Sequence, residues 1–487
     1  MVLTWLLAIP LTGMLVVLIL PRSAVRAIRL VALFATGAVL TVSLELLNLF
    51  QFRAPGMQFE ELAAWIPQMN IWYHLGVDGI SMPMVILTAL LSFLACIASF
   101  SITERHKEYF ALYLLLEVGM LGTFVSLDLF LFYVFWQVVL VPMYFLIGIW
   151  GGGRREYSAF KFFVYTLAGS LAMLLGIVTL YSQTHTFDMV RLAQLAPQFD
   201  PKLQQILFIA FFLGFAIKVP IFPFHTWLPD AHVDAPTPGS VILAGVLLKM
   251  GGYGFFRISY PLFPAAAQHF AWAMALLGTI NIVYGAFVAM AQTDFKRLVA
   301  YSSVSHMGFV LLGLASLTAE GLNGAMFQMF SHGIITGGMF LLVGVLYDRA
   351  HTRDLNAFGG LGAQVPVYAG FLIFFSLASL GLPGLSGFVA EFLSLVGAFQ
   401  VQQLQVLTMI SALGIVVAAA YMLKVIRAVL LGPFNEKWRS LTDMNPRELF
   451  SLAPLLVVIL ALGFFPLLLL GVQDASIQQL VAHVVVR

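Results

Sequence analysis

Long apolar stretches recur from one end of the chain to the other, and short polar segments join them. Each stretch is long enough to cross a hydrocarbon core of roughly 30 Å as a helix that rises about 1.5 Å per residue. The pattern predicts an all-α, polytopic membrane protein of about fourteen transmembrane helices, folded as a single membrane domain over residues 1–487. The predicted helices are 2–20, 29–50, 81–100, 109–127, 129–150, 159–182, 203–224, 238–260, 270–291, 298–317, 321–346, 367–399, 404–428 and 449–471.

The charged residues support this number of helices. When the chain is threaded through the membrane from an outer N-terminus, fifteen Lys and Arg residues fall in cytoplasmic connections and five in outer ones. Positive residues are enriched on the cytoplasmic side, and one missed helix would mix the two sets, so the asymmetry favours an outer N-terminus. The first stretch has no basic n-region and no A-x-A cleavage site, and we interpret it as a retained helix.

Composition narrows the possible functions. Hydrophobic residues make up 61% of the chain and charged residues 9%, whereas soluble domains have about 45–50% and about 25%. The net charge of +2 provides no basic stripe, so we exclude nucleic acid as a partner and expect the lipid bilayer instead. Cys96 is the single cysteine, which leaves no ligand set for an iron–sulfur cluster. We expect no cofactor in this chain.

Two of the apolar stretches contain residues that break a helix. Pro220 and Pro223 interrupt the seventh stretch, because proline cannot donate a backbone hydrogen bond. The segment 381–387, Gly-Leu-Pro-Gly-Leu-Ser-Gly, interrupts the twelfth more severely. Irregular backbone at membrane depth persists where it lines a cavity or is buried in protein, and paired breaks are typical of transporters built from inverted repeats. Two ordinary proline kinks are the alternative.

Five ionisable residues inside the apolar stretches form a candidate proton relay. In chain order they are Lys218, Lys249, His306, His332 and Glu391. A charge at the centre of a membrane helix costs about 2.5–3.5 kcal/mol on insertion scales, so such residues are rare without a function. Histidine titrates near neutral pH and suits proton transfer. The alternatives are structural: each histidine as a hydrogen-bonding group between helices, and Lys249 as the partner of a freed carbonyl.

Three segments show a family resemblance, namely 215–257, 290–310 and 380–399, which include KVPIFPFHTWLPDAH, FKRLVAYSSVSHMG and GLPGLSGFVAEF. They are similar to the antiporter-like subunits of proton-pumping NADH:quinone oxidoreductase, respiratory complex I. Among these subunits the sequence is most similar to the M type, the counterpart of mitochondrial subunit four. The likeness extends from the first helix to about residue 450.

The resemblance implies a fold and a role for each candidate residue. The fold has two inverted repeats of five helices, at about 109–260 and about 270–428, each with a broken helix, and flanking helices at both ends. Lys218 matches the lysine of the first broken helix, Lys249 the central lysine, His306 and His332 the histidines of the axis, and Glu391 the terminal glutamate. Glu391 points to the M type, because the L and N subunits and the Mrp antiporters resemble one another in having lysine there.

The function implied is proton translocation within a bacterial inner-membrane NADH:quinone oxidoreductase. The chain is expected to have no redox centre of its own, to receive its driving force from quinone reduction in partner subunits, and to have L-type and N-type neighbours. It stops soon after the fourteenth predicted helix, without the long lateral helix of an L subunit. Three alternatives remain: an Mrp-type cation/proton antiporter, a subunit of a membrane-bound hydrogenase, and a structural spacer that does not pump.

Gln137 departs from the family pattern. The family usually has a glutamate at this position, which pairs with the lysine matched by Lys218. An ion pair at 4 Å contributes about 4 kcal/mol at an effective dielectric constant of 20, and a glutamine cannot supply it. Glu117, in the middle of the fourth apolar stretch, requires a partner or a proton. We hypothesise that Glu117 provides the displaced carboxylate; the alternative is a subunit that pumps weakly or not at all.

Overall fold

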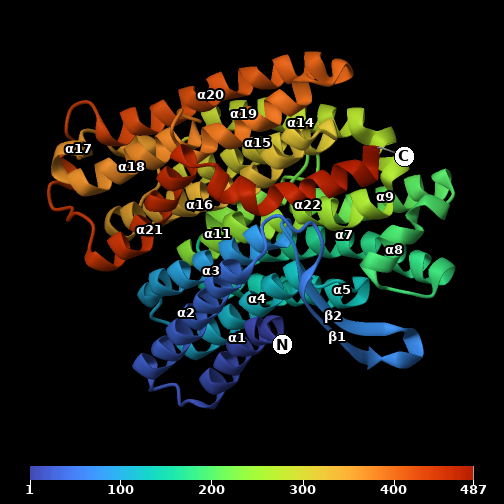
Figure 1. Ribbon diagram of the computed structural model, residues 1–487. Coiled ribbons are helices and arrows are strands. Elements are labelled where there is room, and N and C mark those ends of the chain that lie inside the picture. The colour runs from blue at the N-terminus through green and yellow to red at the C-terminus, as the bar shows by residue number, and fades with distance from the viewer. Residues whose placement is uncertain (486–487) are drawn as a thin grey trace.

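Apolar helices make up most of the structure (Figure 1), as the hydrophobic pattern predicts. The computed structural model describes residues 1–485. Two strands, β1 (Gln58–Ile66) and β2 (Ile71–Val77), form the sheet. The helices are α1 (Val2–Ile19), α2 (Val25–Leu49), α3 (Ser81–Ala98), α4 (His106–Val125), α5 (Leu129–Val138), α6 (Leu140–Trp150), α7 (Arg155–Thr184), α8 (Met189–Leu195), α9 (Pro201–Lys218), α10 (Trp227–Asp234), α11 (Thr237–Ile242), α12 (Leu248–Gly254), α13 (Tyr260–Leu262), α14 (Pro264–Ala291), α15 (Phe295–Ser316), α16 (Ala319–Ala350), α17 (Leu361–Gln364), α18 (Pro366–Ser379), α19 (Ser386–Phe399), α20 (Gln405–Leu430), α21 (Pro446–Phe464) and α22 (Leu467–Val485).

Fourteen helices within residues 1–485 are long and apolar enough to span a membrane. This confirms the predicted number, although the set differs from the predicted one. The stretch 367–399 is divided into α18 and α19, which have 14 residues each and fall outside the set. The helix α22 is in the set and was not predicted.

The chain bends between α21 and α22, so the prediction of one helix over 449–471 is wrong in its bounds. Pro466 cannot continue the helical hydrogen bonding. Along its length α22 then meets the starts of other helices. The Ser476 hydroxyl accepts a hydrogen bond from the Gly79 amide at 2.9 Å, and Asn323 donates to Asp474 at 2.8 Å. The helix therefore lies across one end of the bundle, in front of the other helices in Figure 1.

The antiparallel hairpin β1–β2 projects from this same end of the bundle, which we call the hairpin end (Figure 1). Leu62 pairs with His74, and Asn70 makes the turn with φ near 55°. This segment lies between the predicted helices 29–50 and 81–100, where no strand is predicted. The run Ile-Trp-Tyr of β2 is rich in the β-branched and aromatic residues that favour strands, and this signal was missed.

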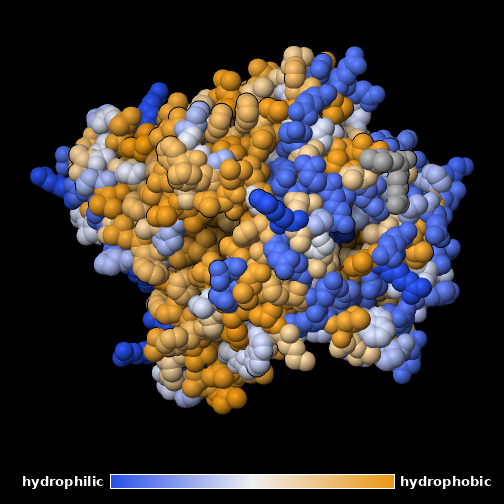
Figure 2. All heavy atoms as spheres, in the orientation of Figure 1, coloured by the Kyte–Doolittle hydropathy of each residue, from blue (hydrophilic) through white to orange (hydrophobic). Residues whose placement is uncertain are grey.

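The connections that carry most of the basic residues meet at the opposite end. Arg22 pairs with Glu108 at 2.6 Å, and Arg349 pairs with Glu448 at 2.8 Å. The first contact joins the connection that follows α1 with the start of α4, and the second joins the end of α16 with the start of α21. These segments must lie on the same side of the membrane if successive helices cross it in alternating directions. Between the two ends Figure 2 shows many hydrophobic residues on the surface, with hydrophilic residues gathered toward the side that carries the hairpin and α8. An exposed hydrophobic belt of this kind suits a bilayer.

His74 attaches the hairpin to the bundle. Its ring nitrogens lie 3.2 Å from Glu60 of β1 and 3.2 Å from Asp188, which precedes α8. Burial opposes protonation of the ring, but the contacts with Asp188 and Glu60 outweigh burial and raise the pKa of His74 above its ordinary value. The protonated ring therefore holds two carboxylates at the base of the hairpin.

We expect the hairpin to loosen as the pH rises. A raised pKa in the folded state means that the stabilisation is complete below the ordinary histidine pKa of about 6.5 and is lost as the pH increases through the raised value. Amide hydrogen exchange of residues 58–77, corrected for the intrinsic pH dependence, should become faster over that range. His74→Gln should remove this dependence, and an unchanged pH profile in that variant would show that another group controls the hairpin.

The breaks in the two predicted helices are confirmed. The helix α9 ends at Lys218 and α10 begins at Trp227. Asn281 of α14, which is fully buried, satisfies the backbone of this break: it accepts from the Phe222 amide at 2.8 Å and donates to the Pro220 carbonyl at 3.1 Å. The indole of Trp227 donates to the Ile217 carbonyl at 2.9 Å. Irregular backbone is thus buried in protein with its polar groups paired.

The second break separates α18 from α19 and contains two glycines with positive φ. Gly381 has φ near 81° and Gly384 φ near 90°, a conformation that favours glycine. A Cβ at Gly381 would lie 3.2 Å from the Glu391 carboxylate, which shows that this side chain points back toward the break. The predicted position of the break thus places Glu391 beside irregular backbone.

Two short antiparallel bridges occur at opposite ends of the bundle. At the hairpin end Asp128 lies opposite Asp188, and at the other end Asp294 lies opposite Asp354. The paired residues are 60 positions apart in the sequence in both cases. Each bridge has the same pair of backbone hydrogen bonds, at 2.8 Å, between the residues that flank the aspartates.

Candidate functional site

Lys249 lies in the centre of the segment Thr237–Leu262, of which residues 238–260 are all buried. Its ammonium donates to the Ala244 carbonyl at 2.5 Å and lies 2.6 Å from Nδ1 of His332 on α16. Ala244 belongs to a π-helical turn, Leu243–Leu247, and a second one, Phe255–Ser259, follows α12. Turns of this kind occur frequently at functional sites. Lys249 therefore has both a carbonyl partner and a titratable partner.

His306 and Glu391 form a second pair. Nδ1 of His306 on α15 lies 2.9 Å from the Glu391 carboxylate on α19, and Nε2 lies 3.2 Å from the hydroxyl of Ser379 at the end of α18. The rings of His306 and His332 are 5.5 Å apart between centroids. All these side chains are buried. Contacts thus run from Lys249 to His332, then to His306 and Glu391, and we call these four residues the polar axis.

The order of the polar axis in space differs from the order of its residues along the chain. His332 lies beside Lys249, and His306 lies beside Glu391. The reason is that α16, which carries His332, packs against the segment of Lys249 as well as against α15 and α19. His332 therefore lies beside Lys249, although it follows His306 in the sequence. The two histidines and Glu391 line a small cavity together with Gln328.

Lys218 stands apart from this axis. It is the last residue of α9, and only 2% of its surface is exposed. Its ammonium lies 5.4 Å from the centroid of the Trp136 ring and 5.5 Å from that of Phe162, and within residues 1–485 it forms no ion pair or hydrogen bond. Gly251 permits close packing here, because a Cβ there would lie 2.9 Å from Cβ of Lys218. The segment of Lys249 therefore packs directly against the end of α9.

Gln137 follows Trp136 near the end of α5 and is half-buried. Its amide nitrogen donates to the Tyr133 hydroxyl at 2.7 Å, and its amide oxygen has no hydrogen-bond partner among the described residues. The position is thus close to the aromatic ring that Lys218 contacts. The glutamine places no charge near the Lys218 ammonium.

Glu117 is fully buried in α4, and neither carboxylate oxygen has a hydrogen-bond partner within residues 1–485. It lies one turn after Tyr113, whose hydroxyl donates to the Ser92 carbonyl of α3 at 2.6 Å. The face of α4 that meets α5 is instead that of Gly119, where an added Cβ would lie 3.2 Å from Val138 at the end of α5. Glu117 therefore faces α3, and the structure does not bring it together with Lys218.

Comparisons with known proteins place this arrangement in a family. Residues 126–417 match the family described as NADH:quinone oxidoreductase/Mrp antiporter, TM. The chain is 48% identical over 473 residues to NADH-quinone oxidoreductase subunit M of Rhodobacter capsulatus, with 95% of this chain and 92% of the relative covered. It is 41% identical over 484 residues to NADH-ubiquinone oxidoreductase chain 4 of Marchantia polymorpha, with 99% and 97% covered. The chain belongs to this family.

Solved structures share the fold. A chain of respiratory complex I from Thermus thermophilus with bound NADH superposes with a TM-score of 0.90 at 30% identity, covering 99% of this chain and 100% of the other. A chain of the Mrp complex from Dietzia sp. DQ12-45-1b gives a TM-score of 0.86 at 23% identity, covering 98% and 97%. The second likeness shows the fold alone. The all-α, polytopic membrane fold with about fourteen transmembrane helices that the sequence predicts is therefore confirmed for this family member.

Several polar residues of this family member were missed. His232 of α10 is fully buried, stacks on Phe340 at 4.6 Å between centroids, and has no hydrogen-bond partner for either ring nitrogen within residues 1–485. Lys296, which precedes the predicted helix 298–317, is buried in α15 and donates to the Ala235 carbonyl at 2.5 Å. The motif HTWLPDAH contained the signal for His232, since histidine is uncommon in an apolar segment.

Asp230 organises the charges at the end opposite the hairpin. Its carboxylate lies 2.7 Å from the Lys161 ammonium, 3.1 Å from Arg297 and 3.9 Å from Arg154. These four residues come from α10, α7, α15 and the connection before α7. The cluster holds the half-helix after the first break against its neighbours.

Proposed function

We propose that the chain is the M-type membrane subunit of an NADH:quinone oxidoreductase, and that it carries protons along the polar axis, driven by quinone reduction in partner subunits. The observation that supports this most directly is the close pairing of buried titratable groups, with Lys249 2.6 Å from His332 and His306 2.9 Å from Glu391. Ionisable groups buried in membrane proteins and paired with one another are typical of proton relays. The chain carries no redox centre in this proposal.

The geometry suggests how a proton moves within the first pair. The ammonium of Lys249 can donate to Nδ1 of His332 when that ring is neutral and its proton is on Nε2. Transfer of the proton to Nδ1 leaves a neutral lysine and a ring with protons on both nitrogens. Nε2 has no hydrogen-bond partner within residues 1–485, so its proton is the one free to leave. The ring thus passes on a proton without rotating.

The second pair accepts the proton across the small cavity. The ring centroids are 5.5 Å apart, and a water molecule between the rings can bridge them. A proton that reaches His306 has a carboxylate partner, Glu391, already in place. Ser379 holds the other nitrogen of His306 and fixes the orientation of the ring.

Lys218 acts on the axis through its charge in this proposal. It packs beside the segment of Lys249, and two ammonium groups near each other disfavour being charged together. The inverted repeats expected from the resemblance find support in the two bridges of equal spacing at opposite ends of the bundle. In this proposal each repeat supplies one broken helix and one end of the proton path.

The assignment can be tested by purifying the complex through a tag on this chain. We expect mass spectrometry to identify quinone-site and NADH-oxidising subunits together with L-type and N-type neighbours, in the inner membrane of a bacterium. NADH-driven acidification of inverted membrane vesicles should be independent of Na⁺. Co-purifying hydrogenase subunits, or Na⁺ transport without a redox donor, would instead support the hydrogenase or Mrp alternative.

The side on which Glu117 lies leads to a prediction about Gln137. Because Glu117 faces α3, Glu117→Gln should change NADH-driven pumping by less than about twofold. Gln137→Glu should have the larger effect, since it introduces a carboxylate next to the ring that Lys218 contacts. Pumping and quinone reduction in vesicles would be measured for both variants and for the double variant. Loss of pumping in Glu117→Gln that Gln137→Glu restores would establish that Glu117 replaced the family glutamate.

A further inference from the structure

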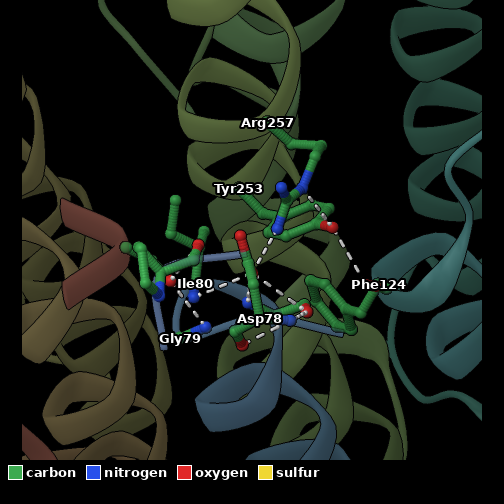
Figure 3. A network of polar contacts seen from close by, with 9 residues as sticks. Asp78, Gly79, Ile80, Phe124, Tyr253 and Arg257 are labelled. Atoms are coloured by element: carbon green, nitrogen blue, oxygen red, sulfur yellow. Dashed lines mark hydrogen bonds and ion pairs between the residues drawn. The ribbon is translucent and has the colours of Figure 1, made fainter. Parts of the chain in front are cut away.

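A polar network that the axis does not use lies at the hairpin end (Figure 3). The Arg257 guanidinium forms a buried ion pair with Asp78, the residue that follows β2. The same guanidinium donates through Nε to the Tyr253 hydroxyl at 3.0 Å, and this hydroxyl donates to the Phe124 carbonyl at 2.9 Å. Figure 3 shows Arg257, Tyr253 and Asp78 directed toward one another. The network thus joins β2, α4 and the segment Thr237–Leu262.

The network lies on the same helical segment as the central lysine. Lys249, Tyr253 and Arg257 follow one another at intervals of four residues, which places them on one face of the segment. At about 1.5 Å per residue, Arg257 is roughly 12 Å nearer the hairpin end than Lys249. All three are buried. A proton that moved between Lys249 and the hairpin end along this face would therefore have to pass Arg257.

A large pocket begins where this face ends. Its empty volume is about 1060 Å³, and its walls come from the connection after α2, from α8 and from α22. Asp78 and Arg257 are both part of its lining. The ion pair therefore separates the pocket from the buried segment that carries Lys249.

The Asp78 carboxylate is held in place by hydrogen bonds at the start of α3. It accepts from the Ile80 and Ser81 amides, at 3.0 Å each. Two amide donors and the guanidinium fix the orientation of this carboxylate. α22 also holds this turn in place, because the Gly79 amide donates to Ser476. Asp78 thus positions Arg257, and the guanidinium remains the permanent charge at the floor of the pocket.

We propose that Arg257 is the fixed positive charge that closes the proton axis toward the hairpin end, and that Asp78 is the positioning residue that holds it there. A permanent cation in a narrow polar passage repels protons and other cations, so protons in the pocket do not return to Lys249. This proposal rests on the proposed function, since it assumes that Lys249 carries protons. It assigns a role to two residues outside the polar axis.

The experiment measures the passive proton leak of the purified complex in liposomes, under an imposed K⁺ diffusion potential and without NADH. Arg257→Gln removes the charge and should increase the leak by about tenfold. Arg257→Lys keeps a cation at the site and should remain as tight as the wild type. Asp78→Asn keeps the cation and leaves an amide oxygen to accept from it, so its leak should stay well below that of Arg257→Gln. A leak in Asp78→Asn equal to that in Arg257→Gln would overturn the proposal, because both variants break the ion pair and only one removes the cation. Loss of pumping in Asp78→Asn, with no leak in Arg257→Gln, would make Asp78 a proton carrier and would equally overturn it.

Arg257→His provides a readout that a purely structural role would not affect. The imidazole is charged below its pKa of about 6.5 and neutral above it, so the leak should be low in acidic buffer and high in alkaline buffer. A leak independent of pH in an assembled Arg257→His complex would contradict a barrier made of charge. This variant also decides the question if Arg257→Gln fails to assemble.

A double variant separates this proposal from the proposed function. In Arg257→Gln with Lys249→Met the leak should disappear, because the path loses its central carrier. A leak that persists there would show that protons bypass Lys249, and the barrier proposal would fail whatever the pumping assay shows. Normal pumping by Lys249→Met alone would refute the proposed function, while the comparison of Arg257→Gln with Asp78→Asn would still decide whether the cation closes the pocket.

Discussion

Lys249→Met is expected to lower NADH-driven proton pumping by about tenfold or more while the complex still assembles. Methionine has nearly the length of lysine and is apolar, so it fills a site that is fully buried without leaving a charge there. It removes the donor that lies 2.6 Å from His332 and interrupts the axis at its first pair. Pumping would be followed as acidification of inverted vesicles, with quinone reduction and subunit content measured in parallel.

Lys424→Met is the matched control for this variant. Lys424 lies on α20, and its ammonium donates to the Met290 and Gln292 carbonyls at 2.8 and 3.0 Å. It therefore caps the end of α14 and has no titratable partner in these contacts. Its loss should affect stability more than pumping. Normal pumping by an assembled Lys249→Met complex would refute the relay, because no other described side chain pairs with His332 at Nδ1.

The membrane spans could be predicted because their signals are local. A helix must bury about twenty apolar residues to cross the bilayer, and a proline interrupts helical hydrogen bonds wherever it occurs. Both breaks therefore lie where the sequence places them, between Lys218 and Trp227 and between Ser379 and Ser386. The hairpin was missed because a connection of this length carries no hydropathy signal. The role of Asn281, whose side chain hydrogen-bonds to the backbone of the first break, was missed because that backbone is distant in sequence.

The contacts of the candidate site depend on helix rotation and packing, which no local pattern contains. Glu117 faces α3 because Gly119 lies on the face that packs against α5, and the sequence alone does not say which face packs. The order of the axis likewise follows from the position of α16 between its neighbours. The resemblance predicted these four residues as candidates for the axis. It did not predict that His332 pairs with Lys249 and that His306 pairs with Glu391.

Substitutions of Glu391 should affect pumping in the order Ala, then Gln, then Lys, from the most to the least severe. Ala removes the partner that lies 2.9 Å from His306, and pumping should fall by about tenfold or more. Gln preserves a hydrogen bond to Nδ1 but cannot exchange a proton, so it should impair pumping nearly as much. Lys restores a titratable group. Acidification of inverted vesicles, quinone reduction and subunit content would be measured for each variant.

The structure gives a physical reason for the tolerance of lysine at this position. Lys249 already shows that a buried ammonium can lie 2.6 Å from Nδ1 of a histidine within this bundle. Glu391→Lys would present the same chemistry to Nδ1 of His306, with Gly381 leaving space beside the side chain. The pair would then hold its proton on the lysine rather than share it with a carboxylate, and the pH dependence of pumping should change even where the rate does not.

Ser379→Ala is the control for the orientation of His306. It removes the hydroxyl that lies 3.2 Å from Nε2 and leaves the carboxylate in place, so pumping should decrease only a fewfold. If Ser379→Ala proves as severe as Glu391→Ala, the orientation of the ring and not the titratable partner limits transfer. If Glu391→Ala pumps better than Glu391→Lys, no specific proton is exchanged at this position. The axis must then end at His306, which would leave the cavity between the two histidines as its last step.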